Sequence, residues 1–170
     1  MDKLARNFCR LLMALAGVAM VAAFLTIALN IVARSVGWDV PGLDGYAGYA
    51  IAAALFLALP GTFRQGEHIR TTLLLQRVGP RTRAALEYWA LLAGLALTLY
   101  LAWFACRLVA QSHAMHDVAA SADATPLWLP QLAMALGCLG FAMSFVQALV
   151  ARFTGTRYFE LPAGDATHAE

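Results

Sequence analysis

The sequence predicts an all-α integral membrane protein with four transmembrane helices, and three observations support this fold class. Of the 170 residues, 61% are hydrophobic and only 13% are charged, whereas soluble domains carry roughly 25% charged residues. The charges gather in short zones, and the stretches between them contain no Asp, Glu, Lys or Arg. Each stretch is long enough to cross a hydrocarbon core, which takes about 20 apolar residues. These stretches are 11–33, 45–63, 88–106 and 124–151.

The first stretch follows Lys3, Arg6 and Arg10, and basic residues before an apolar run are also typical of a signal peptide. A cleavable signal peptide has an apolar region of about 7–15 residues and then a cleavage site. Here the apolar run continues for 23 residues. The sequence therefore predicts an uncleaved membrane anchor at 11–33.

The second and third stretches, 45–63 and 88–106, are 19 residues each and predict two further spans. The fourth contains Pro126 and Pro130 near its start, so the span is expected at 131–151. Together the four spans predict one transmembrane domain over 1–155, followed by a flexible cytoplasmic tail over 156–170. A soluble helical bundle is the alternative, but its helices would need polar outer faces, which these stretches lack.

The distribution of Lys and Arg predicts the orientation in the membrane, because short cytoplasmic loops carry an excess of these residues. Ten of the twelve lie in the N-terminal tail, the loop after the second span and the C-terminal tail, and only Arg34 and Arg107 lie on the other side. The sequence thus predicts that both termini are cytoplasmic. The basic residues then serve as topology signals and partners of lipid headgroups, so no nucleic-acid binding is expected.

The cytoplasmic loop after the second span contains the segment 69–78, in which Ile69, Leu73 and Val78 can form one apolar face with Arg70 and Arg77 on the polar side. Such a pattern suits a short helix lying in the headgroup plane. A plain connector explains the same segment, and the pattern does not decide between the two.

The sequence shows no chemistry of its own, so neither an enzyme nor a bound cofactor is expected. Haem in a four-helix protein needs histidines inside the spans, and all four histidines lie in loops or the tail. The cysteines are single and scattered. His113 and His116 with Asp117 could form part of a metal site. A stand-alone membrane redox or metal-binding protein, or a small exporter formed by oligomerisation, therefore remains an alternative.

Four sequence features carry a resemblance to a known family. Asn30 and Arg34 end the first span, Asp44 opens the second, and the run Arg64-Gln-Gly66-Glu-His68-Ile69-Arg70 follows it. The segment 126–137, Pro-Leu-Trp-Leu-Pro-Gln-Leu-Ala-Met-Ala-Leu-Gly, leads into the fourth span. Over residues 10–155 the chain resembles the small permease subunit of tripartite ATP-independent periplasmic (TRAP) transporters. It departs from the family pattern at Asp44, where Glu is common, and in the second span, where Ala replaces aromatic residues.

The resemblance implies a subunit of a secondary transporter in the bacterial inner membrane. Its expected partners are a large permease subunit, which carries the sodium and substrate sites, a periplasmic solute-binding protein that docks transiently, and membrane lipids. The small subunit would brace the large one and help dock the periplasmic protein for ion-coupled uptake of an organic solute, a carboxylate in most of the family. The residues expected at subunit interfaces or in structural roles are Asn30, Arg34, Asp44, Arg64, His68 and Arg70.

Overall fold

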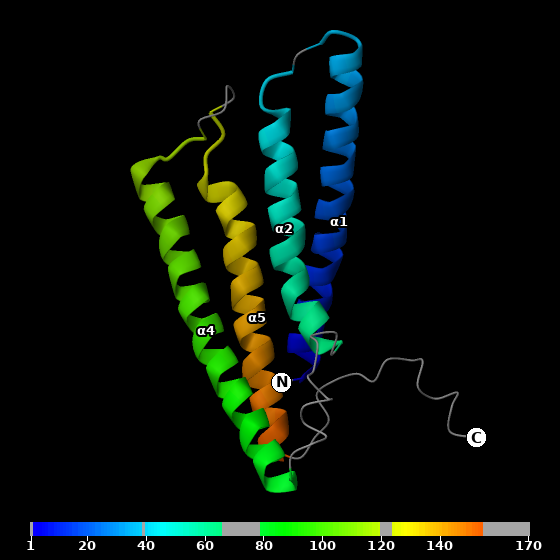
Figure 1. The fold of residues 1–170 in the computed structure, drawn as a ribbon. Helices are drawn as coiled ribbons and strands as arrows, with labels where there is room; N and C mark the ends of the chain where they lie inside the picture. The colour runs from blue at the N-terminus through cyan, green and yellow to red at the C-terminus, as the bar shows by residue number, and fades with distance from the viewer. Residues whose placement is uncertain (1, 39, 66–78, 120–123, 155–170) are drawn as a thin grey trace, which may run out of the picture.

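The computed structural model describes residues 2–38, 40–65, 79–119 and 124–154. They form four long helices: α1 (Asp2–Ser35), α2 (Leu43–Arg64), α4 (Pro80–Met115) and α5 (Trp128–Thr154) (Figure 1). Each is long and apolar enough to cross a membrane. This confirms the all-α, four-span fold class. The interfacial segment expected at 69–78 and the tail expected at 156–170 lie outside the described residues.

The two edge helices, α1 and α4, extend well beyond the charge-free stretches 11–33 and 88–106 of the sequence. α4 has 36 residues and α1 has 34, which correspond to about 54 Å and 51 Å at a rise of 1.5 Å per residue. The hydrocarbon core is only about 30 Å thick. Both helices are therefore long enough to project beyond the apolar part of a bilayer.

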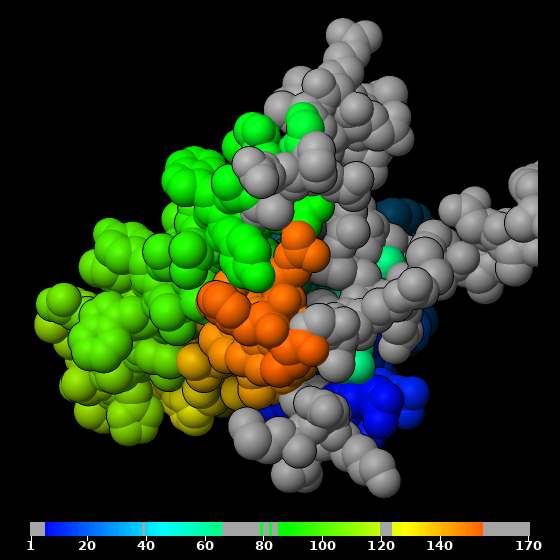
Figure 2. All heavy atoms as spheres, turned by 90° about the horizontal axis from the view of Figure 1, so that it is seen from below, coloured from blue at the N-terminus to red at the C-terminus, as the bar shows by residue number. Residues whose placement is uncertain are grey.

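The four helices stand in an open row in the order α1, α2, α5, α4 (Figure 1). α2 packs against α1 on one side and α5 on the other, and α4 packs against α5. α1 and α5 also touch, where the Cys9 Sγ lies 3.8 Å from the Ser144 Oγ. Seen from below, the C-terminal end of α5 lies between α4 and the first turns of α1 (Figure 2). The helices α1 and α4 thus form the two edges of the row.

Two clusters of small and aliphatic side chains hold neighbouring helices together. Leu12 and Ala16 of α1 pack with Leu57 of α2. On the other side of the row, Ala102 and Ala105 of α4 pack with two buried residues of α5, which are Ala135 and Cys138. Small residues at these positions let the helix backbones approach closely, which is how membrane helices gain packing energy.

Aromatic rings add to the contact between α2 and α5 towards the C-terminal end of α2. Phe63 stacks on Phe145 with ring centroids 4.2 Å apart. It also meets the edge of Phe141, at 5.7 Å between centroids. Offset-stacked and edge-to-face pairs of this kind are favoured arrangements of aromatic rings. These ring contacts fix how far α5 is shifted along its axis relative to α2.

Candidate subunit-interface site

The structure brings Asn30, Arg34 and Asp44 together at one end of the α1–α2 pair, and we call these residues the polar triad. Asn30 and Arg34 are one turn apart on α1 and therefore share a face. Asp44 lies in the first turn of α2. The Asn30 Nδ2 donates a hydrogen bond to the Asp44 Oδ1. The Arg34 guanidinium lies 3.8 Å from the Asp44 Oδ2.

A short connection positions the triad by folding the chain back after α1. The backbone N–H of Trp38 donates to the carbonyl of Ala33 over 2.8 Å, which closes the end of the helix. Gly37 and Gly42 then adopt positive φ angles of 79° and 90°, a conformation that glycine reaches without steric cost. Two left-handed residues within six positions reverse the chain, so that Asp44 faces the last turns of α1.

The triad is presented at the surface and is not sealed inside the row. The Arg34 and Asp44 side chains are 71% and 78% exposed. An exposed ion pair contributes only about 0–1 kcal/mol to stability. Arg34 has five N–H donors and a carboxylate accepts several hydrogen bonds, so both groups keep capacity for further partners. The arrangement suits contact with another molecule better than it suits stabilisation of this chain.

The remaining candidate residues lie elsewhere. Arg64 is half-buried at the last residue of α2, 20 residues and about 30 Å along the helix from Asp44. His68 and Arg70 lie outside the described residues. The structure therefore brings together three of the six residues that the sequence singled out, and it places Arg64 at the opposite end of the same helix.

A second link at the triad end of the row was not predicted from the sequence. The Tyr46 hydroxyl lies within hydrogen-bond distance of the Thr125 hydroxyl, at 3.0 Å, and so connects α2 to the α4–α5 loop. An isolated bridge between Val118 and Pro126 holds the same loop together. Tyr46 and Thr125 are 79 positions apart, and no pattern in the sequence predicts that they meet.

An ion pair at the other end of the row was also missed. The Arg152 guanidinium of α5 lies 2.8 Å from the Glu87 carboxylate of α4. Its guanidinium carbon also lies 5.5 Å from the centre of the Tyr88 ring, within the range of cation–π attraction. From the sequence, Arg152 was expected to be a topology signal and a partner of lipid headgroups, because two charges in separate zones gave no indication that they meet.

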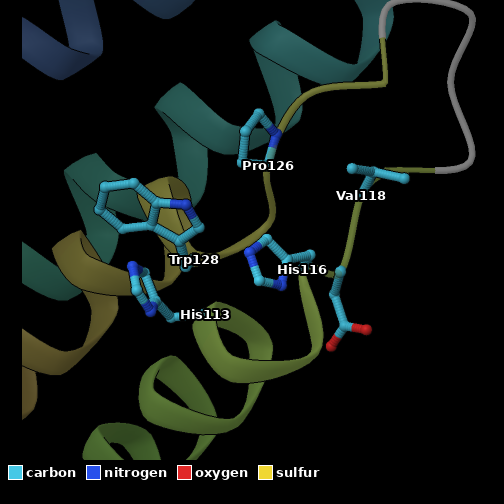
Figure 3. A pocket seen from close by; sticks show the side chains of 6 residues that line it. His113, His116, Val118, Pro126 and Trp128 are labelled. Carbon is cyan, nitrogen blue, oxygen red and sulfur yellow. The ribbon is translucent and has the colours of Figure 1, made fainter.

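The histidines considered as metal ligands lie near the triad end of α4, and Figure 3 shows them beside Trp128. The His113 ring meets the Trp128 ring edge-on at 5.4 Å and the His116 ring at 6.5 Å between centroids. Across the residues that the structure describes, no three or more His, Cys, Asp or Glu side chains are placed to hold a metal ion. The site geometry therefore gives no support to the metal-binding alternative.

Four apolar spans with an exposed polar cluster at one end define a multi-span membrane protein. The chain belongs to the family of the DctQ component of tripartite ATP-independent periplasmic transporters, whose family model matches residues 23–155. No curated protein matched the chain in sequence. The matched region contains the polar triad and all of α2, α4 and α5. The protein is therefore a small component of a TRAP transporter and a protein of the bacterial inner membrane.

Proposed function

We propose that the chain is the small membrane subunit that braces the large TRAP permease and helps dock the periplasmic solute-binding protein. The transporter would take up an organic solute, most simply a carboxylate, by sodium-coupled symport. Both the substrate class and the coupling ion follow from the family resemblance. The large permease carries those sites in this proposal, and the small subunit contributes no catalytic group.

The observation that carries this proposal is the exposed polar triad at the end of an open row of helices. Arg34 and Asp44 are largely exposed, so much of their hydrogen-bonding capacity remains available to a partner molecule. At the two opposite edges of the row, α1 and α4 expose large apolar side chains along most of their length, such as Phe24 at 70% and Leu97 at 68%. A surface with a polar anchor at one end and apolar flanks suits a second membrane protein.

The proposed topology places residues 1–155 in the membrane domain with both termini in the cytoplasm. The excess of Lys and Arg in the tails and in the loop after α2 supports this orientation. The triad and the α4–α5 loop would then face the periplasm. Arg64, His68 and Arg70 would face the cytoplasm, where headgroups or the large permease would bind them.

Affinity purification of the tagged chain from its native membranes in mild detergent tests the proposal most directly. We expect a large, many-helix permease to copurify in near-equal amount, as judged by mass spectrometry. Recovery of the chain alone, or with respiratory components, would contradict the subunit assignment. A visible spectrum and metal analysis of the same sample test the redox and metal alternative.

Reconstitution tests the functional part of the proposal. Proteoliposomes containing the permease, the chain and the solute-binding protein should take up solute under a sodium gradient. Vesicles without the chain should lose uptake, and vesicles with the chain alone should show none. Uptake by the chain alone would favour the alternative hypothesis of a small exporter formed by oligomerisation.

A further inference from the structure

The edge helix α4 carries aromatic and basic side chains on the side turned away from α5. Ala102 and Ala105 lie on the side that packs against α5. Because an α-helix has 3.6 residues per turn, Tyr100, Trp103 and Arg107 lie on the opposite side, and we call these three residues the α4 outer face. Tyr100 is 63% exposed and Trp103 is 69% exposed. In Figure 1, α4 forms one edge of the row, so none of the described helices covers this face.

Tyr100 lies well inside the apolar part of α4. The charge-free stretch of this helix, 88–106, lies between Glu87 and Arg107. Tyr100 precedes Arg107 by about 10 Å along the helix axis and follows Glu87 by about 20 Å, at a rise of 1.5 Å per residue. The hydrocarbon core is about 30 Å thick. Tyr100 therefore lies within the core, whichever end of α4 is cytoplasmic.

The direction of the side chain takes the Tyr100 hydroxyl further from the nearer membrane surface. Helical side chains lean toward the N-terminus of their helix, which for α4 is the end at Pro80. Tyr100 and Trp103 thus lean away from Arg107 and toward the middle of the core. Tyr88 lies close to the N-terminal end of the span, so the same lean brings its hydroxyl to the headgroups, where interfacial aromatic residues are enriched. The Tyr100 hydroxyl cannot reach the headgroups in this way.

The Tyr100 hydroxyl needs a hydrogen-bond partner that the described part of the chain does not supply. Among the described residues, the Tyr100 ring meets the Phe104 ring at 4.6 Å between centroids, and its hydroxyl forms no hydrogen bond. The Trp103 N–H also has no acceptor among them. Lipid tails offer neither donors nor acceptors, so an unpaired hydroxyl at this depth is costly. A polar group on a helix of another membrane protein would satisfy it.

The outer side of α1, at the opposite edge of the row, has no such requirement. Within 11–33, its exposed large side chains are Leu, Val, Ile, Met and Phe, with Phe24 exposed to 70%. The Thr26 hydroxyl donates to the carbonyl of Ala22 over 2.7 Å. Asn30 donates to Asp44. Lipid tails therefore suit the outer side of α1, whereas the α4 outer face calls for a protein.

We propose that the α4 outer face binds a transmembrane helix of the large permease and that the Tyr100 hydroxyl forms a hydrogen bond with that helix. The inference rests on the proposed function, in which the large permease is the stable membrane partner of this chain. Trp103 supplies a large apolar surface and a second donor about one turn away. A permease with many helices can contact this face in addition to the polar triad.

Photo-crosslinking in native membranes tests which molecule covers the α4 outer face. The crosslinker p-benzoylphenylalanine replaces Leu97, which is 68% exposed and about one turn from Tyr100. Phe24 on α1 is the matched site, because it is 70% exposed and also lies near the middle of its span. We expect a crosslink to the large permease from Leu97 and lipid adducts alone from Phe24. A crosslink from Leu97 to a second copy of the chain, or to lipid alone, would overturn the inference.

Tyr100→Phe tests the hydrogen bond, because it removes the hydroxyl and keeps the ring. The Kd of the chain for the large permease is measured in detergent micelles by energy transfer between labelled subunits. We expect this Kd to rise about 3- to 15-fold, the range of a hydrogen bond between membrane helices. Tyr49→Phe on α2 is the control and should leave the Kd unchanged, because Tyr49 leans toward the nearby end of α2 at Leu43.

The two experiments separate this inference from the proposed function. An unchanged Kd in the Tyr100→Phe variant would show that the hydroxyl forms no bond with the permease, and the inference would be wrong. The proposed function would survive that result, provided that the unmodified chain binds the permease. Failure of the unmodified chain to bind the permease at all would overturn the proposed function itself.

Discussion

Gly137 of α5 lies directly against the main-chain carbonyl group of Phe56 of α2. A Cβ atom at residue 137 would lie 2.5 Å from the carbonyl carbon and 2.9 Å from the Cβ of Phe56, both shorter than real contacts of this kind. The neighbouring backbone cannot rotate away as a side chain can. The two central helices of the row can therefore approach this closely only while residue 137 has no side chain.

Gly137→Ala should destabilise the protein by about 1–3 kcal/mol, the usual cost of overpacking, reduced by the higher helix propensity of alanine. Thermal unfolding in detergent measures the effect. The matched control is Gly17→Ala on α1, where an added Cβ meets nothing within 4 Å. Equal Tm changes in the two variants would show that α2 and α5 do not meet at this point.

Asp44→Ala should change the stability of the isolated chain by less than about 1 kcal/mol, because the triad is exposed. It should nevertheless sharply reduce copurification of the large permease, since the carboxylate holds both Asn30 and Arg34 in place. Asp44→Glu, the residue common in the family, should restore copurification. A large loss of Tm with normal copurification would assign the triad a purely structural role.

The Tyr46–Thr125 contact should couple α2 to the α4–α5 loop. In a double-mutant cycle with Tyr46→Phe and Thr125→Val, we expect a coupling free energy of about 0.5–1.5 kcal/mol, the range of a net hydrogen bond. Amide hydrogen exchange should show faster exchange in the loop around Thr125 in either single variant. Additive effects of the two substitutions would mean that the hydroxyl groups do not interact.

Arg152→Gln should weaken the contact between α4 and α5 near the C-terminal end of α5, because the guanidinium contacts both Glu87 and Tyr88. We expect a loss of about 0.5–2 kcal/mol from the ion pair and the cation–π contact combined. Arg152→Lys should retain part of this energy, because it keeps the charge without the planar guanidinium. Detergent unfolding at low and high salt measures both, and a salt-independent loss identical in the two variants would contradict the assignment.

The four spans could be predicted from the sequence because a charge in the hydrocarbon core is costly, so uncharged stretches mark where the core is crossed. The helix ends could not be predicted in this way. α4 begins at Pro80 and ends at Met115, whereas its uncharged stretch covers only 88–106. A helix continues through charged residues such as Arg107 once it leaves the apolar layer, and hydropathy does not register that continuation.

The contacts at the candidate site were predictable only in part. Asn30 and Arg34 are four positions apart, a spacing that places them on one helix face, and the family resemblance grouped both with Asp44 as expected interface or structural residues. The Tyr46–Thr125 contact depends on a loop in which His116 and Ala124 adopt positive φ angles. Neither residue type by itself predicts this conformation. Which helix packs against which could not be predicted either, because all four spans are similarly apolar.

The single-file order of α1, α2, α5 and α4 makes the described part of the chain a wall one helix thick. Such a wall has two broad sides and encloses no lumen between its helices. In the proposed function, the solute would accordingly cross the membrane alongside this protein, within its partner, the large permease. Substitutions in the wall should alter how firmly that partner is held, and leave the choice of solute unchanged.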